Sequence, residues 1–207
     1  MTQTPSYWQS ACRKLARRDA KMAALIRRFP NDHLRGRGDA FKTLCRSIVG
    51  QQISLKAADS IHQSLEYRIG RLTPSNVKRR RHTTLRQCGL SENKAHCLKS
   101  LATFFIDERI TRGYWQRHDL DTIHAKLTSV KGVGNWTFQM FAIFYLQHPD
   151  IYPIKDMGLI NAIQKLYGGR RTLQPRHLLE IGENWAPWRT VATWYLWRSI
   201  DPEPVIY

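Results

Sequence analysis

Apolar residues recur along most of this 207-residue chain at the spacing of amphipathic helices. Between Asp39 and Gly50 they fall at i, i+3, i+4, i+7 and i+8, which predicts a helix with one apolar stripe made of Phe41, Leu44, Cys45, Ile48 and Val49. Ser54 is the expected N-cap of a second helix that runs to Ile69. Between the two lies QQIS, residues 51–54, where adjacent glutamines are in most proteins only a solvated loop.

Further helices follow the same pattern. Helix starts are expected at Thr73-Pro74 and Ser91-Glu92, and an amphipathic helix is expected over residues 120–130. Residues 136–146 are apolar at most positions, which is typical of a helix at the centre of a core. Two more helices are predicted near residues 155–168 and 187–200. Because no stretch alternates at period two, strands should be few or absent, and the expected fold class is all-α.

Charge narrows the class of partner. The chain carries 33 Lys and Arg against 16 Asp and Glu, a formal net charge of +17, and 42% of its residues are hydrophobic, enough for a sizeable core. A surplus of this size favours binding to a polyanion through phosphate neutralisation and counterion release, so nucleic acid is the leading partner class. The alternative is that the charge only keeps the protein soluble. The basic segment VKRRRHTTLR, residues 77–86, would by itself be a solvated face.

Other classes are disfavoured by what the sequence lacks. It has no run of about 18 apolar residues and no apolar signal-peptide core at its N-terminus, so we expect no membrane span and a cytoplasmic location, or a nuclear one in a eukaryote. The four cysteines lack metal-ligand spacing, and we predict neither a structural zinc, an iron–sulfur cluster nor a disulfide framework: Cys12, Cys45, Cys88 and Cys97.

A Gly-x-Gly turn, KGVG at residues 131–134, joins two of the predicted helices. Glycines there give the backbone conformations closed to residues with a Cβ and leave amide N–H groups unshielded. The helix that follows presents its positive dipole end at the turn, and Lys131 adds a charge, so the turn is a candidate for gripping DNA phosphates without reading sequence. An ordinary helix-hairpin turn is the alternative.

Four ordered motifs carry a resemblance to a known family. The run LTSVKGVGNWTFQMF followed by DIYPIKDMGL resembles the helix-hairpin-helix DNA glycosylases, and IVGQQISLKAA with WAPWRTVATWYLWR is similar to their alkylated-base branch, the DNA-3-methyladenine glycosylase II family. The resemblance covers roughly residues 40–200. It implies one glycosylase domain over residues 1–207 with two helical lobes, one of residues 40–130 and one of residues 1–39 plus 131–207, and an active-site cleft between the lobes.

The resemblance places the catalytic aspartate of the family on Asp156, 22 positions after Gly134. Cleavage of an N-glycosidic bond builds positive charge on the deoxyribose, and a nearby carboxylate stabilises that charge and can orient or deprotonate the attacking water. The alternative from spacing alone is a helix N-cap, since aspartates before helices usually have that role. Asp150 is the nearest rival and has the context of a loop residue.

Trp136 occupies the position where bifunctional relatives carry the lysine that attacks the sugar. Tryptophan has no amine, and neither Lys131 nor Lys155 matches that position, so the resemblance implies a monofunctional enzyme that leaves an abasic site. An indole also stacks well on an electron-poor alkylated purine. The implied base pocket comprises Trp136, Met140, Trp185 and Trp188, with Met140 standing where some relatives have tyrosine.

For DNA binding the resemblance implies the turn at Gln51, Gln52 and Ser54, with Gln52 as the side chain that enters the gap left by the flipped nucleotide, and the hairpin Lys131, Gly132, Val133 and Gly134. It also implies a monovalent cation on the backbone carbonyls of Lys131 and Val133, and no other metal or cofactor. The expected partner is double-stranded DNA with alkylated bases, bound by a monomer without an obligate protein partner.

Three alternatives stay open at this stage. A bifunctional glycosylase/lyase would need an amine nucleophile near the sugar. A non-catalytic helix-hairpin-helix DNA-binding module would explain the charge and the glycines, but it leaves the tryptophans and Asp156 without a use. A helical RNA-binding protein is compatible with the charge alone.

Overall fold

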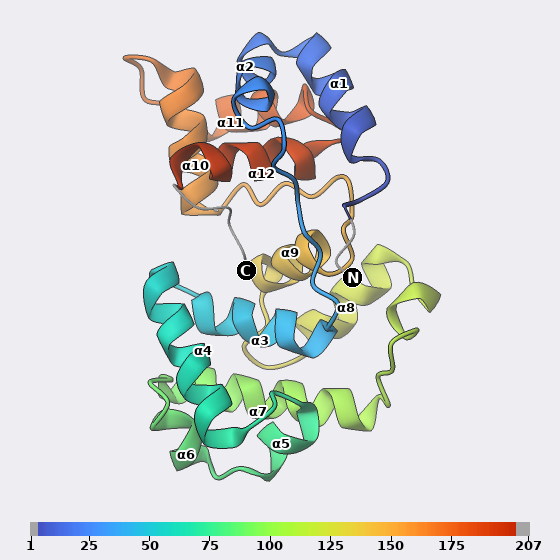
Figure 1. Ribbon diagram of the computed structural model, residues 1–207, viewed down its shortest axis with the longest axis vertical. Helices are drawn as coiled ribbons and strands as arrows, with labels where there is room; N and C mark the ends of the chain where they lie inside the picture. The colour runs from blue at the N-terminus through green and yellow to red at the C-terminus, as the bar shows by residue number, and fades with distance from the viewer. Residues whose placement is uncertain (1–3, 202–207) are drawn as a thin grey trace. The chain divides into compact units, whose positions relative to one another are not determined.

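The computed structural model describes residues 4–201, and every regular element among them is helical. Contacts divide the chain into two compact units (Figure 1). Of the described residues, the terminal unit comprises 4–36 and 142–201, and the central unit comprises Arg37–Phe141. The all-α prediction is confirmed for the described residues. The cleft expected between the lobes stays a prediction.

The central unit combines helices that the sequence pattern predicts with a short one at His82–Arg86, inside the basic segment, that it does not predict. They are α3 (Ala40–Gly50), α4 (Leu55–Ile69), α5 (Pro74–Arg79), α6 (His82–Arg86), α7 (Glu92–Asp107), a 3-10 turn at Trp115–Arg117, and α8 (Leu120–Thr128). Polar side chains cap these helices at the predicted starts Ser54, Thr73 and Ser91, and also at Asp39. Each side chain accepts a hydrogen bond from a backbone amide in the first turn of the helix that follows. The predicted stripe on α3 is fully buried.

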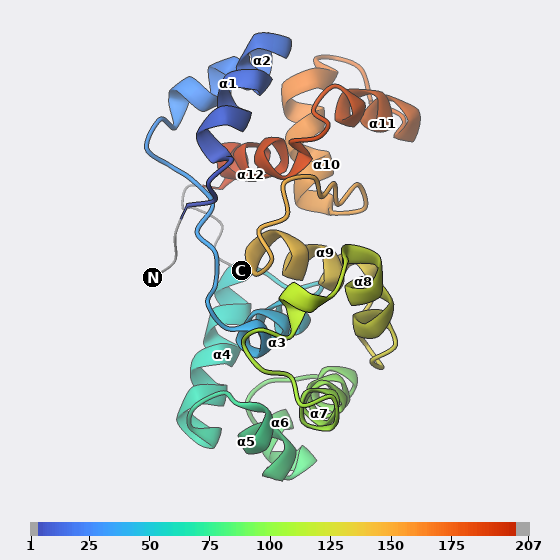
Figure 2. The ribbon, with the colours of Figure 1, turned by 90° about the vertical axis from the view of Figure 1, so that its right-hand side faces the viewer.

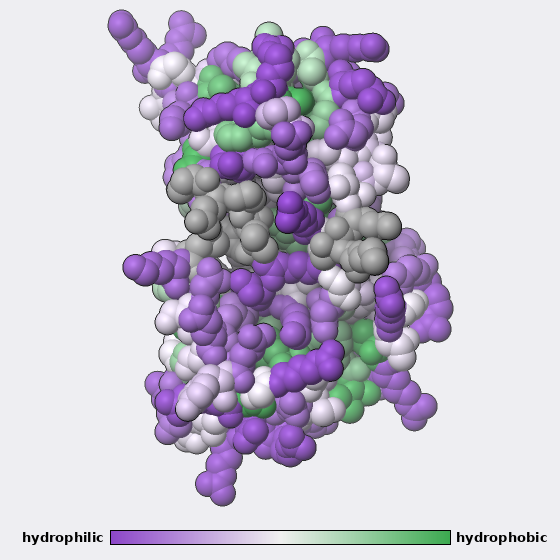
Figure 3. Space-filling model, viewed as in Figure 1, coloured by the Kyte–Doolittle hydropathy of each residue, from purple (hydrophilic) through white to green (hydrophobic). Residues whose placement is uncertain are grey.

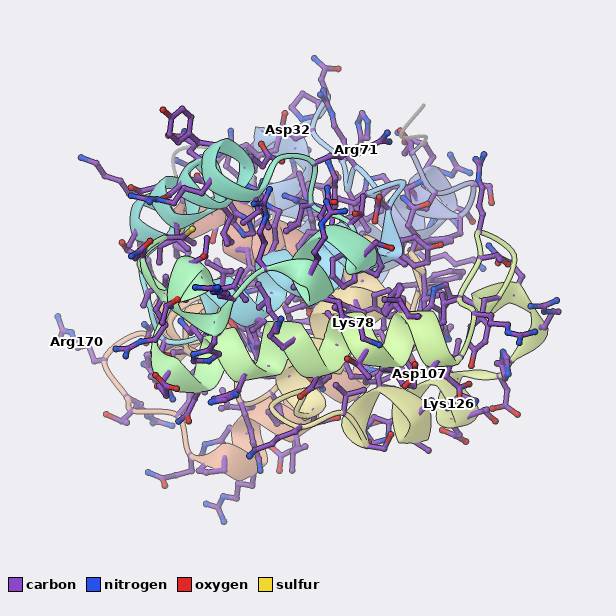
Figure 4. All side chains as sticks on the ribbon, turned by 90° about the horizontal axis from the view of Figure 1, so that it is seen from below. Asp32, Arg71, Lys78, Asp107, Lys126 and Arg170 are labelled. Carbon is purple, nitrogen blue, oxygen red and sulfur yellow. The ribbon has the colours of Figure 1, made fainter. Side chains whose placement is uncertain are left out.

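Helix α7 is the long element against which the smaller helices of this unit pack. Both ribbon views show α5 and α6 beside it (Figure 2). Ion pairs link the same elements at the surface, including Lys78 on α5 with Asp107 on α7 (3.9 Å), both labelled in Figure 4. Since such exposed pairs add little stability, the apolar contacts beneath them hold the unit together.

The terminal unit joins the two ends of the chain. Its helices are α1 (Trp8–Arg18), α2 (Ala20–Arg28), α10 (Met157–Ile163) continued by a π-helical turn (Gln164–Gly168), α11 (Pro175–Glu183) and α12 (Arg189–Ile200). The buried Trp8 of α1 packs edge-on against Trp194 of α12, with ring centroids 5.4 Å apart. Sequence analysis did not predict α1, α2 or α11.

Helix α9 (Asn135–Phe144) is the buried helix expected near residues 136–146, and the division between the units falls within it. Residues 131–141 were assigned to the same lobe as the C-terminal half, but they pack with the central unit. The reason is that Phe141 meets Trp115 edge-on at 4.9 Å, and Phe138 meets His124 at 4.6 Å.

The surface and the cysteines follow the composition. On the face shown in Figure 3 the exposed side chains are mainly hydrophilic.

All four cysteines are free and buried. Within residues 4–201 no helix combines the length and apolarity needed to cross a bilayer.

Candidate active site and DNA-binding surface

Asp156 lies directly before α10, and the residue is only 8% exposed. Its Oδ1 accepts a hydrogen bond from the backbone N–H of Leu159 at 2.8 Å, so the N-cap alternative is confirmed. The same oxygen accepts a second bond from the indole Nε1–H of Trp197 at 2.9 Å. These two donors fix the orientation of the carboxylate in a largely dry environment, where its charge acts strongly on nearby groups.

Trp197 is the functional residue that sequence analysis missed. It is 3% exposed, and its ring stacks on Phe144 with a centroid distance of 6.0 Å and an interplanar angle of 12°. The signal lay within the motif WAPWRTVATWYLWR, whose last tryptophan was not assigned. Only the tertiary fold brings this residue of α12 to Asp156, 41 positions earlier.

Gly158 adds a close approach to the same carboxylate. A Cβ at this position would lie 3.2 Å from Asp156 Oδ1 and 3.6 Å from the indole of Trp197. A side chain at residue 158 would therefore press on the carboxylate oxygen and would contact the indole.

Asp150, the alternative candidate to Asp156, forms an ion pair with Arg189. Its two carboxylate oxygens accept from Arg189 Nε and Nη2 at 2.6 and 2.7 Å, and Oδ1 also accepts from the Arg189 amide at 3.3 Å. Burial raises the pKa of this carboxyl, but the bonds from Arg189 outweigh burial and the net effect is a lowered pKa. Asp150 is thus a structural ion pair that anchors the start of α12.

The two hairpin glycines differ in why they are glycine. Gly132 has φ +87°, and a Cβ there would lie 2.6 Å from the Sγ of Cys97, so both conformation and space exclude a side chain. Gly134 has an ordinary φ and open space where a Cβ would go. The expectation that both glycines have conformations closed to other residues is therefore wrong for Gly134. Its lack of a side chain instead keeps the exposed start of α9 unshielded.

The hairpin itself is a turn closed by the Val133 N–H, which donates to Val130 O at 3.0 Å. Lys131 is exposed and Val133 is buried. Carbonyl oxygens suit a monovalent cation, and two of those nearby, Val130 O and Gly132 O, already accept hydrogen bonds within the protein. The cation implied at Lys131 and Val133 stays a prediction.

The turn at residues 51–54 lies beside the hairpin in the central unit. Gln51 Nε2 donates to Thr137 Oγ1 at 2.8 Å and to Gly132 O at 3.4 Å, so this side chain links the turn to the hairpin. Gln52 is exposed and has φ +58°, the left-handed region that non-glycine residues rarely adopt. Ser54 caps α4 by accepting from Ala57 N. Of the two glutamines, Gln52 is the one presented outward.

The four aromatic and thioether candidates for the base pocket separate clearly. Trp136 is half-buried near the start of α9. Met140 and Trp185 have no exposed surface, and Trp185 donates its Nε1–H to Asp19 at 3.1 Å. Trp188 stacks on Tyr7 at 5.8 Å, with the Lys14 ammonium 5.1 Å from its ring.

These placements correct part of the pocket prediction. Trp185 is a core residue of the terminal unit, packed against Tyr152 and Tyr167, and its assignment to the pocket is wrong because no face is open to a base. Met140 is likewise completely buried, so it offers no exposed surface to a base. Trp136 and Trp188 remain predicted contacts, one in each unit.

Among the described residues, one group of side chains offers several metal ligands close together: His82, Glu92 and His96, whose ligand atoms lie within 4.8 Å of one another. Arg86 donates to Glu92 at 3.1 Å, and both histidines contact its other oxygen. A cation would have to compete with this guanidinium, so we assign no metal to the group.

Comparison with known proteins identifies a matching family and related sequences. The model of the HhH-GPD superfamily base excision DNA repair proteins matches residues 45–187. DNA-3-methyladenine glycosylase 1 of Schizosaccharomyces pombe is 28% identical over 183 residues, which cover 86% of this chain and 80% of that protein.

Solved structures agree with this comparison. The S. pombe 3-methyladenine DNA glycosylase in complex with abasic DNA superposes with a TM-score of 0.82 at 28% identity, covering 92% of this chain and 96% of that one. A DNA-3-methyladenine glycosidase from Bacillus halodurans superposes with a TM-score of 0.75 at 30% identity, covering 96% and 90%.

Proposed function

This chain belongs to the HhH-GPD superfamily of base excision DNA repair proteins, and from that premise we propose that it is a monofunctional DNA glycosylase acting on alkylated purines of the 3-methyladenine type. It binds duplex DNA, extrudes the damaged nucleotide and hydrolyses the N-glycosidic bond, leaving an abasic site. The observation that carries this proposal is the buried carboxylate of Asp156, held by Trp197 and the start of α10.

The chemistry follows from that carboxylate. As the bond to the base lengthens, positive charge develops on the deoxyribose, and the fixed negative charge of Asp156 stabilises it without reorganisation. The same carboxylate orients the attacking water and accepts its proton. Trp136 stacks on the electron-poor base and offsets the few kcal/mol lost on unstacking.

DNA binding is assigned to the central unit. The Gly134 end of the hairpin leaves the start of α9 open to phosphate, Lys131 adds charge, and Gln52 enters the space vacated by the flipped nucleotide. We further propose that the protein acts as a monomer in the compartment that holds the genome, the cytoplasm of a bacterium or the nucleus of a eukaryote.

The first test is release of free bases from methylated duplex DNA, resolved by chromatography, with the wild type and Asp156→Asn in parallel. Asparagine keeps an oxygen for the N-cap and for Trp197 but removes the charge, so the variant should fold, bind abasic DNA and lose activity by on the order of a hundredfold or more. Full activity in the variant would remove Asp156 from the mechanism. Release of no base by the wild type would favour the non-catalytic DNA-binding module.

The lyase alternative has its own test. Borohydride should fail to trap the protein on DNA, because no lysine stands at the Trp136 position. Trapping that is lost in Lys155→Ala would instead assign a Schiff base to the exposed lysine next to Asp156.

A further inference from the structure

The turn at residues 51–54 contains one residue with an unfavourable backbone conformation. Helix α3 ends at Gly50, and Gln52 follows in the left-handed region at φ +58°. A non-glycine residue persists there only when its surroundings enforce the conformation. Gln52 and the neighbouring Ile53, 38% exposed, are the side chains that this turn displays.

Lys94 supplies one of the enforcing contacts. It lies in the first turn of α7, half-buried, and its Nζ donates to Val49 O at 2.8 Å and to Gln51 O at 2.7 Å. These carbonyls lie at the C-terminal end of α3, where helix carbonyls lack intrahelical partners and the dipole is negative. The half-buried ammonium at this point both satisfies them and fixes where the chain leaves the helix. Burial lowers the pKa of Lys94, consistent with its enclosed position.

The side chain of Gln51 supplies the other contact, through Thr137 Oγ1 and Gly132 O. The turn is thus held on its backbone by α7 and on its side chain by the hairpin and α9. All of these residues belong to the central unit.

We propose that Lys94 is a positioning residue for base extrusion: by binding the carbonyls of Val49 and Gln51, it holds the 51–54 turn in the strained shape that presents Gln52 and Ile53 to the DNA. The effect on base extrusion rests on the proposed function. The two hydrogen bonds from Lys94 to Val49 O and Gln51 O, called the tether below, are present in the free protein. Loss of the tether lowers the fraction of complexes in which the nucleotide is extruded, and therefore the rate of base release from bound DNA.

The same helix carries a matched control. Lys99 is also half-buried on α7, and its Nζ donates to Lys78 O and Arg80 O, both at 2.5 Å, at the C-terminal end of α5. Lys94 and Lys99 therefore make the same kind of contact: each donates to two carbonyls at the C-terminal end of another helix, α3 for Lys94 and α5 for Lys99. Only Lys94 contacts the 51–54 turn. Substituting each with methionine removes the charge and keeps most of the stem.

The experiment compares wild type, Lys94→Met, Lys94→Arg and Lys99→Met. Thermal unfolding should show a similar loss of stability for the two methionine variants. Fluorescence of 2-aminopurine placed next to a 3-methyladenine analogue reports nucleotide extrusion, and single-turnover rates are taken at saturating DNA. Lys94→Met should lower the fluorescence signal and the rate by about tenfold, the scale of one charged hydrogen bond, while Lys99→Met changes neither. Lys94→Arg, which keeps charge and donors, should recover most of the loss.

Equal rates and fluorescence for Lys94→Met and Lys99→Met would overturn the proposal. Amide hydrogen exchange at residues 51–54 reads the tether without substrate: it should be faster in Lys94→Met than in wild type or Lys99→Met, and unchanged exchange would also overturn the proposal. If the wild type releases no base while exchange behaves as expected, the proposed function fails and the tether stands.

Discussion

The region around Asp156 and the hairpin at residues 131–134 are built in opposite ways. The carboxylate is 8% exposed and its oxygen accepts from two fixed donors, whereas Lys131, Gly132 and Gly134 are exposed and Gly134 leaves the start of α9 open. A charge that acts on a transition state gains strength from a dry, fixed setting, but a grip on phosphates must stay open to a large ligand. The first region depends on a buried side chain held by two donors, and the second depends on exposed backbone.

The largest expected effect tests the backbone half of this comparison. Gly132→Ala forces alanine into φ +87° and against Cys97, and we expect a loss of roughly 2–4 kcal/mol in the free energy of unfolding. Urea unfolding measures the loss. Adding Cys97→Ala should restore part of it by removing the Sγ. A Gly132→Ala protein as stable as wild type would show that the turn has another accessible shape.

The next effect tests the side-chain half. Trp197→Phe keeps a ring to stack on Phe144 but removes the donor to Asp156, so kcat on methylated DNA should fall by roughly tenfold to a hundredfold, while affinity for abasic DNA stays the same. The control is Trp194→Phe, the same change at a buried position of α12 that packs on Trp8. Equal losses of kcat in both variants would indicate a general packing effect.

The next prediction concerns the pH dependence of stability and a buried histidine of the central unit, His62. Burial, and then the charges of Arg46 and Arg37, lower the pKa of His62 to about 3. In the unfolded chain this histidine titrates near its ordinary pKa of roughly 6.5. Between these pH values only the unfolded chain binds the proton. The free energy of unfolding should therefore fall by about 1.4 kcal/mol for each unit by which the pH drops below about 6.5. Above about pH 6.5 the stability contributed by neutral His62 is fully present.

Unfolding measured from pH 7 to pH 4 checks that slope. His62→Gln should remove this part of the acid dependence. An identical slope in wild type and His62→Gln would mean that other groups control the acid sensitivity.

The smallest effect on stability sharpens the contrast between the two glycines. Gly134→Ala meets no neighbouring atom within 4 Å, so the free energy of unfolding should change by less than about 0.5 kcal/mol. The added methyl group nevertheless lies at the start of α9, and affinity for abasic duplex DNA should fall severalfold in a fluorescence anisotropy titration. Unchanged affinity would place the phosphate contact elsewhere on the hairpin.

Sequence analysis worked best where local chemistry decides the outcome. Helix α3 with its buried stripe, the caps at Ser54 and Ser91, and the apolar helix α9 were all predicted, because periodicity and capping act within a few residues. It failed for α1 and α2, short helices that are stabilised by packing on each other and on α12 at the other end of the chain.

Single residues of the site show the same limit. Asp156 could be predicted because a motif marks it, but Trp185 and Trp188 share one motif and only the fold shows that the first lies in the core. The role of Trp197 depends on a contact across 41 positions, and that of Lys94 on carbonyls 43 and 45 positions earlier. Spacing in the sequence carries no trace of such pairs.

The sequence by itself therefore determined the fold class and the family and predicted the site residues, since helical periodicity, net charge and ordered motifs are local or additive properties. The tertiary structure alone decided which donors hold Asp156, why Gly132 rather than Gly134 must be glycine, and what fixes the turn before Ser54. The physical reason is that burial, hydrogen-bond partners and steric room are set by residues far apart in the chain, and folding selects those neighbours together.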